Sequence, residues 1–324
     1  MTFLGPTARW AVLAALALTL PAWAQDYPTR AIKIVVTFTP GGASDLAARV
    51  VGLKLSDALG QPVVVENRLG ANGTIGTQMV AQSEPDGYTL VIGTNPNITI
   101  NPHMRKLAFD PMKDLVPVSM LTETSMILFV NPSVVPVKDV KEFVAYAKAH
   151  PGKVYYASAG SGSLAHLAGE LFKLAAGISL VHVPYKGGTL GVNDVLAGAV
   201  GSMFASVPAV APQIHSGKVR GMAVTGPKRS VFAPEIPTMV ESGYPDVEAL
   251  LWNGLFAPAG TPEPVLRKLR EETAKILARK DVQELFVKQG AEAFPMSEKE
   301  FRAFVQREYE RWGRVIKEAH IKVE

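Results

Sequence analysis

The stretch that decides the fold class is AIKIVVTFTPGGASDLAARVVGLKLSDAL, residues 31–59. Its β-branched start, residues 31–38, predicts a buried strand, and the small residues at 39–43 predict a loop. Apolar residues recur at helical spacing over 44–59 and predict a helix, which Gly60 ends. A strand, a tight loop and a helix in this order are the building unit of α/β folds.

The same alternation continues on the C-terminal side of this stretch. Further strands are predicted over 63–66 and 88–93, with a helix over 73–83 between them. The resulting βαβαβ run predicts an α/β protein whose sheet is largely parallel, with right-handed crossovers.

A second run of the same kind begins near Val154. Two long helices are predicted after it, over 262–280 and 297–319, from apolar residues at helical spacing. The predicted elements of the second run are a strand over 154–157, a loop over 158–162, a helix over 163–176 ended by Gly177, a strand over 180–183, and then helix, strand, helix and a strand over 219–225.

The two runs resemble each other. GGASDLA at 41–47 aligns with GSLAHLA at 162–168, and residues 60–70 align with 177–187. Each half has the order strand, Gly/Ser loop, helix, glycine stop, strand, glycine. This internal repeat predicts two α/β lobes of equivalent topology.

Two apolar, extended segments flanked by proline, 116–131 and 249–258, are predicted to connect the lobes. A chain that crosses twice between two lobes forms a hinge. Lobe 1 is expected to contain residues 25–120 together with 258–324, and lobe 2 residues 121–257.

Residues 1–24 have the pattern of a secretory signal. Arg9 precedes an uncharged apolar run over 10–20, and small residues up to Ala24 predict cleavage before Gln25. A transmembrane anchor is the alternative, but the run is shorter than the roughly 20 residues that a spanning helix needs. An exported chain with no cysteine and no anchor is expected in a bacterial periplasm.

The composition excludes several classes of partner and site. The 324 residues are 48% hydrophobic and 19% charged, which supports a packed core. The net charge of +4 is small and no long basic run occurs, so nucleic acid is not expected as a partner. The absence of cysteine excludes disulfides, thiolate metal sites and a cysteine nucleophile.

The two Gly/Ser loops, 39–44 and 158–163, are the candidate binding elements. A loop of small residues between a strand and a helix leaves the first helical N–H groups free, and the helix dipole favours an anion there. Two such loops facing each other would hold a carboxylate from both sides. The alternative is that Gly41 and Gly42 only permit a tight turn and that Ser44 only caps its helix.

Enzyme chemistry has weaker support. Residues 160–165 read GSGSLA, close to a dinucleotide fingerprint, but the next strand offers no acid for the ribose. His166 and Glu170 share a helix face, yet no other histidine has ligand spacing with them. No nucleophile elbow, zinc motif or phosphate-binding loop occurs, so no catalytic residue, metal or cofactor is expected. Trp252 fits a core position better than a ligand platform.

Six stretches of the chain together form a specific pattern: TPGGASD at 39–45, ENR at 66–68, PDGYTL at 85–90, HLAGELF at 166–172, VPYKG at 183–187 and APAGTP at 257–262. In these stretches the chain resembles the Bug family, the substrate-binding receptors of tripartite tricarboxylate transporters, and the resemblance covers essentially the whole predicted mature chain. It implies a two-lobe periplasmic-binding-protein fold of the type II-like kind, with capture of a small organic acid by the two loops and ordered waters.

Ligand-binding residues follow from the resemblance position by position. Tyr185 and Lys186 fall at the family's Tyr-Lys pair, and Asn95 falls at another turn that faces the cleft. The two loops contribute Gly41, Gly42, Ser44 and Asp45 from the first and Ser158, Ser161, Gly162, Ser163 and His166 from the second.

Ala205 marks a departure from the family pattern. Relatives often have Asp after the phenylalanine of this strand, whereas here Ala205 follows Phe204. Without that carboxylate the site cannot pair with an ammonium group, so organic acids that are not amino acids are expected.

The expected partners are the organic acid and either the membrane subunits of a transporter or a sensor, with the receptor itself a monomer. A periplasmic enzyme acting on a carboxylate, or a sensory receptor without a transporter, is the alternative.

Overall fold

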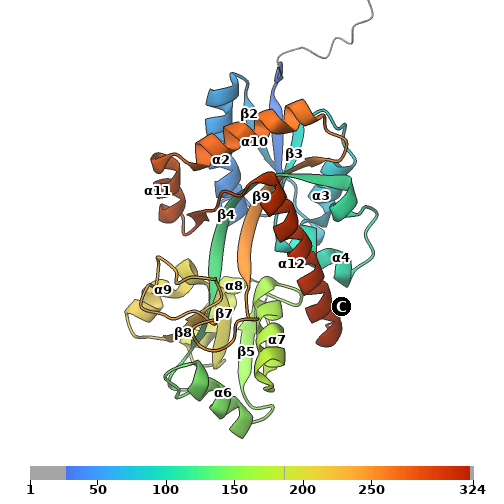
Figure 1. Ribbon diagram of the computed structural model, residues 1–324. Helices are drawn as coiled ribbons and strands as arrows, with labels where there is room; N and C mark the ends of the chain where they lie inside the picture. Colours follow the sequence, from blue (N-terminus) through green and yellow to red (C-terminus); the bar gives the residue numbers. More distant parts are fainter. Residues whose placement is uncertain (1–26, 186, 322–324) are drawn as a thin grey trace, which may run out of the picture.

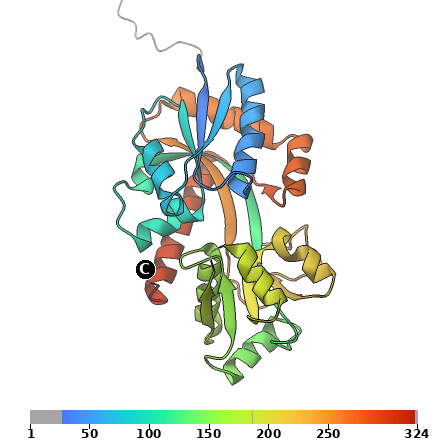
Figure 2. The ribbon, with the colours of Figure 1, turned by 180° about the vertical axis from the view of Figure 1, so that it is seen from behind.

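The computed structural model describes residues 27–185 and 187–321 (Figures 1 and 2). The predicted signal segment and Lys186 lie outside the described residues. The strands are β1 (Ile32–Val36), β2 (Val63–Asn67), β3 (Thr89–Gly93), β4 (Leu115–Val130), β5 (Tyr155–Ser158), β6 (Val181–Pro184), β7 (Ser202–Ser206), β8 (Arg220–Val224), β9 (Leu250–Pro258) and β10 (Glu292–Ala293). The helices are α2 (Ala43–Leu59), η1 (Ala71–Gly73), α3 (Thr74–Ala81), η2 (Asn95–Ile100), α4 (Asn101–Met104), α5 (Pro111–Asp114), α6 (Val140–Ala149), α7 (Leu164–Ala176), α8 (Gly188–Leu196), α9 (Val207–His215), α10 (Glu263–Leu277), α11 (Lys280–Lys288) and α12 (Glu298–Glu318).

Each lobe is built on one half of the sheet (Figure 1). In lobe 1, the upper lobe of Figure 1, β2, β1 and β3 are parallel neighbours in that order, and β9 joins β3 antiparallel. In lobe 2 the order is β6, β5 and β7, also parallel, and β4 joins β7 antiparallel. The two halves therefore have equivalent strand orders, as the sequence repeat predicts.

Both predicted connections are long strands that run side by side between the lobes (Figures 1 and 2). β4 has 16 residues and β9 has 9, and they pair antiparallel from Leu115 opposite Pro258 to Ser125 opposite Leu250. Apolar side chains buried on both faces account for their sequences, which alternate little. The expected lobe boundaries at 120/121 and 257/258 fall inside these two strands.

Helices cover both faces of each half-sheet. In lobe 1 the apolar residues of α2 and α10 pack on one face, while α3 and the start of α12 pack on the other. In lobe 2, α6 and α7 cover one face and α8 and α9 the other. Trp252 on β9 is fully buried in the lobe 1 core, as expected.

Helix α12 serves both lobes rather than lobe 1 alone. Phe301 and Phe304 near its start pack against Trp252 in lobe 1. Trp312 and Ile316 near its end belong to the lobe 2 core that also contains α7. Figure 1 shows the helix descending from the upper lobe towards α7. Its apolar row extends over the whole 21-residue length, so a single amphipathic helix spans the two lobes.

A buried carboxyl group lies on the crossing strand β4. Glu123 is opposite Trp252 on β9 and Glu292 on β10, and its Oε2 has no hydrogen-bond partner among the described residues. Burial, with a smaller contribution from the neighbouring Glu292, raises the pKa of Glu123 to about 7.

The Glu123→Gln variant should change how stability depends on pH. Because the folded-state pKa is raised, the protonated Glu123 stabilises the parent at low pH, and this contribution is lost as the pH rises through about 7. The free energy of unfolding of the variant should therefore gain about 2 kcal/mol on the parent between pH 5 and pH 8. Urea unfolding at both pH values checks this, and identical pH profiles would contradict it.

Candidate functional site

The two Gly/Ser loops have the same backbone conformation. Gly41 and Gly162 lie at φ +78° and +77°, and the residues that precede the helices, Gly42 and Ser163, are both extended. The Gly42 N–H donates to the Thr39 carbonyl at 3.2 Å, as the Ser163 N–H does to the Gly160 carbonyl at 3.1 Å. The local sequence match at 41–47 and 162–168 therefore reports a true structural repeat.

Each loop leaves main-chain donors free at the start of its helix. Within the described residues, the amide groups of Ala43 and Ser44 at the start of α2 donate to no protein acceptor, and neither do those of Leu164 and Ala165 at the start of α7. Such groups, together with the positive end of the helix dipole, favour an anionic ligand.

A cavity of about 550 Å³ lies between the lobes, and every described residue that lines it is uncharged. Lobe 1 contributes Asn72 and Pro96, and the crossing strands contribute Met126 and Leu251. Lobe 2 contributes the starts of three helices: Ser163, Leu164 and Ala165 at α7, Gly188 and Thr189 at α8, and Ser206 and Ala209 at α9. Three helix N-termini that point at one uncharged cavity make it suitable for a carboxylate.

Of the predicted ligand residues, Ser163 and Ala205 line this cavity. In the first loop Gly41 is exposed and Gly42 half-buried, and neither reaches the cavity in this conformation. Ser161 is exposed at the tip of the second loop.

Ser44 and Asp45 use their side chains within lobe 1. The buried Ser44 hydroxyl donates to Asn253 Oδ1 on β9 at 2.6 Å, which ties the first loop to a crossing strand. The Asp45 carboxylate accepts hydrogen bonds from the Gly41 amide, the Arg49 guanidinium and Asn67 Nδ2, each at 2.9 Å. Their side chains therefore shape the loop, and its main chain is the part that remains available to a ligand.

Asn95 is fully buried and does not line the cavity. Its Nδ2 donates to Glu308 Oε2 on α12 at 3.0 Å, and its Oδ1 accepts from the Trp252 amide at 3.3 Å. In this conformation Asn95 connects η2 to α12 and β9, and its neighbour Pro96 faces the cavity.

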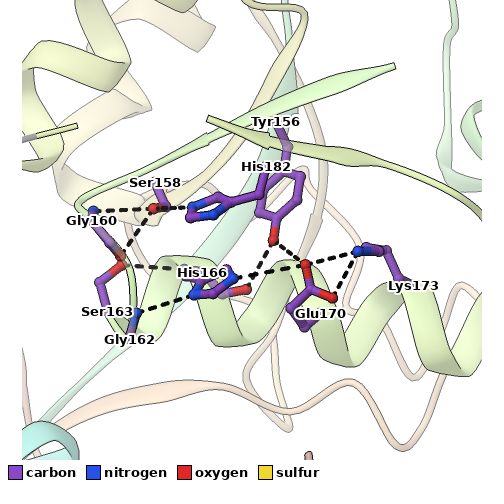
Figure 3. Close-up of polar contacts among 9 residues, drawn as sticks. All are labelled: Tyr156, Ser158, Gly160, Gly162, Ser163, His166, Glu170, Lys173 and His182. Atoms are coloured by element: carbon purple, nitrogen blue, oxygen red, sulfur yellow. Dashed lines mark hydrogen bonds and ion pairs between the residues drawn. The ribbon is translucent and has the colours of Figure 1, made fainter. Parts of the chain in front are cut away.

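A polar network formed by side chains of α7, β5 and β6 supports the second loop (Figure 3). The Gly162 N–H donates to His166 Nδ1 at 3.1 Å, and the His166 ring stacks on His182 with centroids 3.8 Å apart. Ser158 Oγ lies 2.6 Å from His182 Nε2 and also bonds both polar main-chain groups of Gly160. Ser158 and His166 are thus brought together as supports of the loop.

Burial lowers the pKa of both histidines. For His182, burial and the adjacent His166 lower the pKa to about 4. For His166, burial lowers the pKa more than the nearby Glu170 raises it. Both rings are therefore neutral at pH 7.

Tyr185 follows β6 and does not line the cavity in this conformation. Its hydroxyl donates to Asp194 Oδ2 on α8 at 2.6 Å. Burial, together with this hydrogen bond, raises the pKa of Tyr185 to about 12. The prediction for Lys186 falls outside the described residues.

Several cavity residues were not predicted. Asn72 has φ +53°, and it precedes α3 just as Gly188 opens α8 in the other half. The aligned glycines Gly70 and Gly187, at φ +130° and +125°, are the sequence signal that could have revealed this second pair of turns. Asn193 and Gln213 line the cavity from helices whose sequences carry no such mark.

Over residues 27–185 and 187–321, the His, Asp and Glu side chains form no group of three that could hold a metal ion. Within the same part of the chain, none of the helices combines the length and apolarity needed to span a bilayer.

Comparison with known proteins agrees with this geometry. Residues 47–321 match the sequence profile described as "Tripartite tricarboxylate transporter family receptor". BugT of Bordetella pertussis is 38% identical over 313 residues, which cover 96% of each chain.

Two solved structures are similar throughout. Rpa4515 of R. palustris, solved with adipate, is 34% identical, with a TM-score of 0.77 and coverage of 91% of this chain and 99% of that one. MatC (Rpa3494) of Rhodopseudomonas palustris, solved with malate, is 32% identical, with a TM-score of 0.74 and coverage of 90% and 100%. This chain therefore belongs to the family of tripartite tricarboxylate transporter receptors.

Proposed function

We propose that this protein is a periplasmic receptor that captures a small organic acid between its two lobes and delivers it to the membrane subunits of a transporter. The observation that carries the proposal is the uncharged interlobe cavity, faced by the starts of α7, α8 and α9. Main-chain amides can hold a carboxylate there at roughly 1.5–3 kcal/mol for each hydrogen bond to the charged group. Similar proteins solved with adipate and malate support the same ligand class.

The remaining parts of the proposal follow from the sequence. Residues 1–24 act as a cleaved export signal, and the mature chain works as a monomer. Lobe 1 contains residues 25–120 with 258–324, and lobe 2 residues 121–257, while α12 also packs against lobe 2. The receptor binds without catalysing a reaction, and ligand closes the lobes about β4 and β9.

A ligand screen tests this proposal. The mature protein is titrated calorimetrically with malate, adipate, succinate, citrate and benzoate, and small-angle scattering is recorded with each acid at saturation. We expect at least one acid to bind with micromolar affinity and to reduce the radius of gyration. Absence of binding by every acid, with folded protein, would contradict the ligand class. Binding without a change in the scattering curve would contradict closure alone.

Ala205→Asp should change the selectivity of the cavity. Ala205 lies next to the last residue of β7 and lines the cavity, so an Asp side chain there would attract an ammonium group and repel a second ligand carboxylate. The binding preference of the cavity for free succinate over the free amino acid aspartate should shift towards the amino acid by roughly 1–3 kcal/mol, the value of a charged hydrogen bond. Competition binding in parent and variant measures the shift. An unchanged ratio would show that residue 205 does not meet the ligand.

A further inference from the structure

The two loops differ in the group that holds their glycine. In lobe 1 the Gly41 N–H donates to the Asp45 carboxylate at 2.9 Å. Burial alone raises the pKa of Asp45, but hydrogen bonds from Arg49, Gly41 and Asn67 outweigh it and hold the pKa below its usual range. In lobe 2 the equivalent acceptor is the imidazole of His166, at 3.1 Å from the Gly162 nitrogen. The first loop is thus held by a carboxylate that stays ionised, whereas the equivalent second loop is held by an imidazole that can be protonated.

The hydrogen bond from the Gly162 N–H fixes the tautomer of the His166 ring. A donor that points at Nδ1 requires this nitrogen to be unprotonated, so the ring proton resides on Nε2. That nitrogen lies 3.8 Å from Glu170 Oε1. The His182 ring lies almost parallel to His166, at an angle of 9°, and is held by Ser158 at the base of the loop (Figure 3).

Among residues 27–185 and 187–321, the charged and titratable groups that contact the pair come from α7, β5 and β6. On α7, Lys173 Nζ donates to both oxygens of Glu170 at 2.9 and 2.7 Å. On β5, the Tyr156 hydroxyl donates to Glu170 Oε1 at 2.6 Å, and β6 carries His182. The charge of Glu170 is thus already paired, and the positive charge of Lys173 disfavours protonation of His166 and His182.

The other elements against this end of α7 contribute apolar side chains. Met104 of α4 lies where a side chain on Gly162 would be, and Trp312 of α12 belongs to the same core cluster as α7. Neither of these two side chains offers a charged acceptor that could replace Glu170 for a charged imidazole.

We propose that His166 and His182 are positioning residues of the receptor, which must both be uncharged for the second loop to present its amides to the ligand carboxylate. A proton on His166 Nδ1 would face the Gly162 N–H, donor against donor, so the ring or the loop must move. A charge on either ring would also repel the other across the 3.8 Å stack. Acid therefore weakens binding of the carboxylate by the second loop, while Asp45 stays ionised and keeps the first loop in its binding conformation.

This inference rests on the proposed function, because it assigns the second loop to the ligand. Simple attraction between a histidinium and the ligand carboxylate would have the opposite effect, tighter binding in acid. The sign of the pH dependence therefore separates a positioning role from direct charge attraction.

The test compares the parent with His166→Asn and His150→Asn. An asparagine at 166 keeps an oxygen acceptor where Asp45 has one in the first loop, but it cannot be protonated. His150 is exposed at the end of α6, its ring nitrogen bonds the Tyr146 carbonyl and no residue of the network, and it serves as the matched control. Malate and adipate affinities are measured at pH 7.5 and 4.5 in the same buffers, so that titration of the acids themselves cancels between proteins.

We expect the affinity of the parent and of His150→Asn to fall at least about three-fold more in acid than that of His166→Asn. Parallel profiles for the parent and His166→Asn, or a relative gain in acid for the parent, would overturn the proposal. Nitrogen NMR of the ligand-free parent gives a second readout. His166 should be neutral at pH 7, with its proton on Nε2. As the pH is lowered, the chemical shift of the Gly162 amide should change together with the protonation of His166.

A proton on Nδ1 of His166 at pH 7 would overturn the inference even if His166→Asn fails to fold. If none of the five screened acids binds the parent at pH 7.5, the proposed ligand class fails, and the NMR result still decides the role of the histidines.

Discussion

Gly162→Val is expected to lower carboxylate affinity by about a hundred-fold or more while the protein stays folded. Gly162 lies at φ +77°, where a β-branched residue is strained, and its Cβ would come within 2.8 Å of Met104 Cε. The loop must then shift, which misplaces the free amides of Leu164 and Ala165. Loss of two charged hydrogen bonds at roughly 1.5–3 kcal/mol each gives the stated factor. Calorimetry with an acid that binds the parent measures it.

Gly177→Val is the matched control. Gly177 ends the same helix at φ +60°, and a Cβ there would contact nothing within 4 Å. The substitution imposes the same kind of backbone strain at the far end of α7, so stability should fall by about 1–2 kcal/mol while affinity is kept. Equal loss of affinity in both variants would show that general strain, and not loop geometry, controls binding.

Trp312→Ala should be the most destabilising single change considered, at about 3–5 kcal/mol. Trp312 is fully buried between α12 and lobe 2, and its Nε1 donates to the buried Glu308 at 3.0 Å. Truncation leaves both a large cavity and a carboxylate that has lost a donor.

Trp312→Phe separates the two contributions, because it keeps most of the apolar volume and removes only the hydrogen bond. It should cost about 1–2 kcal/mol. Urea unfolding measures both variants. A cost below 1 kcal/mol for Trp312→Ala would contradict the role of α12 as a support shared by the two lobes.

Local signals in the sequence predict the architecture well. Gly60 and Gly177 end helices at the predicted positions, since left-handed glycine caps are a local property. The crossing strands were found from extended apolar runs because they are buried on both faces. The predicted helix over 262–280 corresponds to α10, and α11 follows it as a separate helix that was not predicted.

The site is less predictable because distant contacts decide it. Asn95 follows a strand end, the usual place for a ligand residue, but Glu308, 213 positions later in the chain, takes up its amide. Similarly, Asn253 on β9 binds the hydroxyl of Ser44 from the other end of the sequence. Such pairings depend on how β9 and α12 return to lobe 1, which no local pattern encodes. The loop backbone was predictable because its geometry depends on nearby glycines.

The central claim is that main-chain amides of the two equivalent loops hold the ligand carboxylate once the lobes have closed on it. Amide NMR of the isotope-labelled protein, titrated with an acid that the calorimetric screen shows to bind, tests it most directly. The largest shifts are predicted at Ala43, Ser44, Leu164 and Ala165, whose N–H groups have no protein acceptor. Saturable binding with these four amides unmoved, and the shifts gathered elsewhere, would contradict the account.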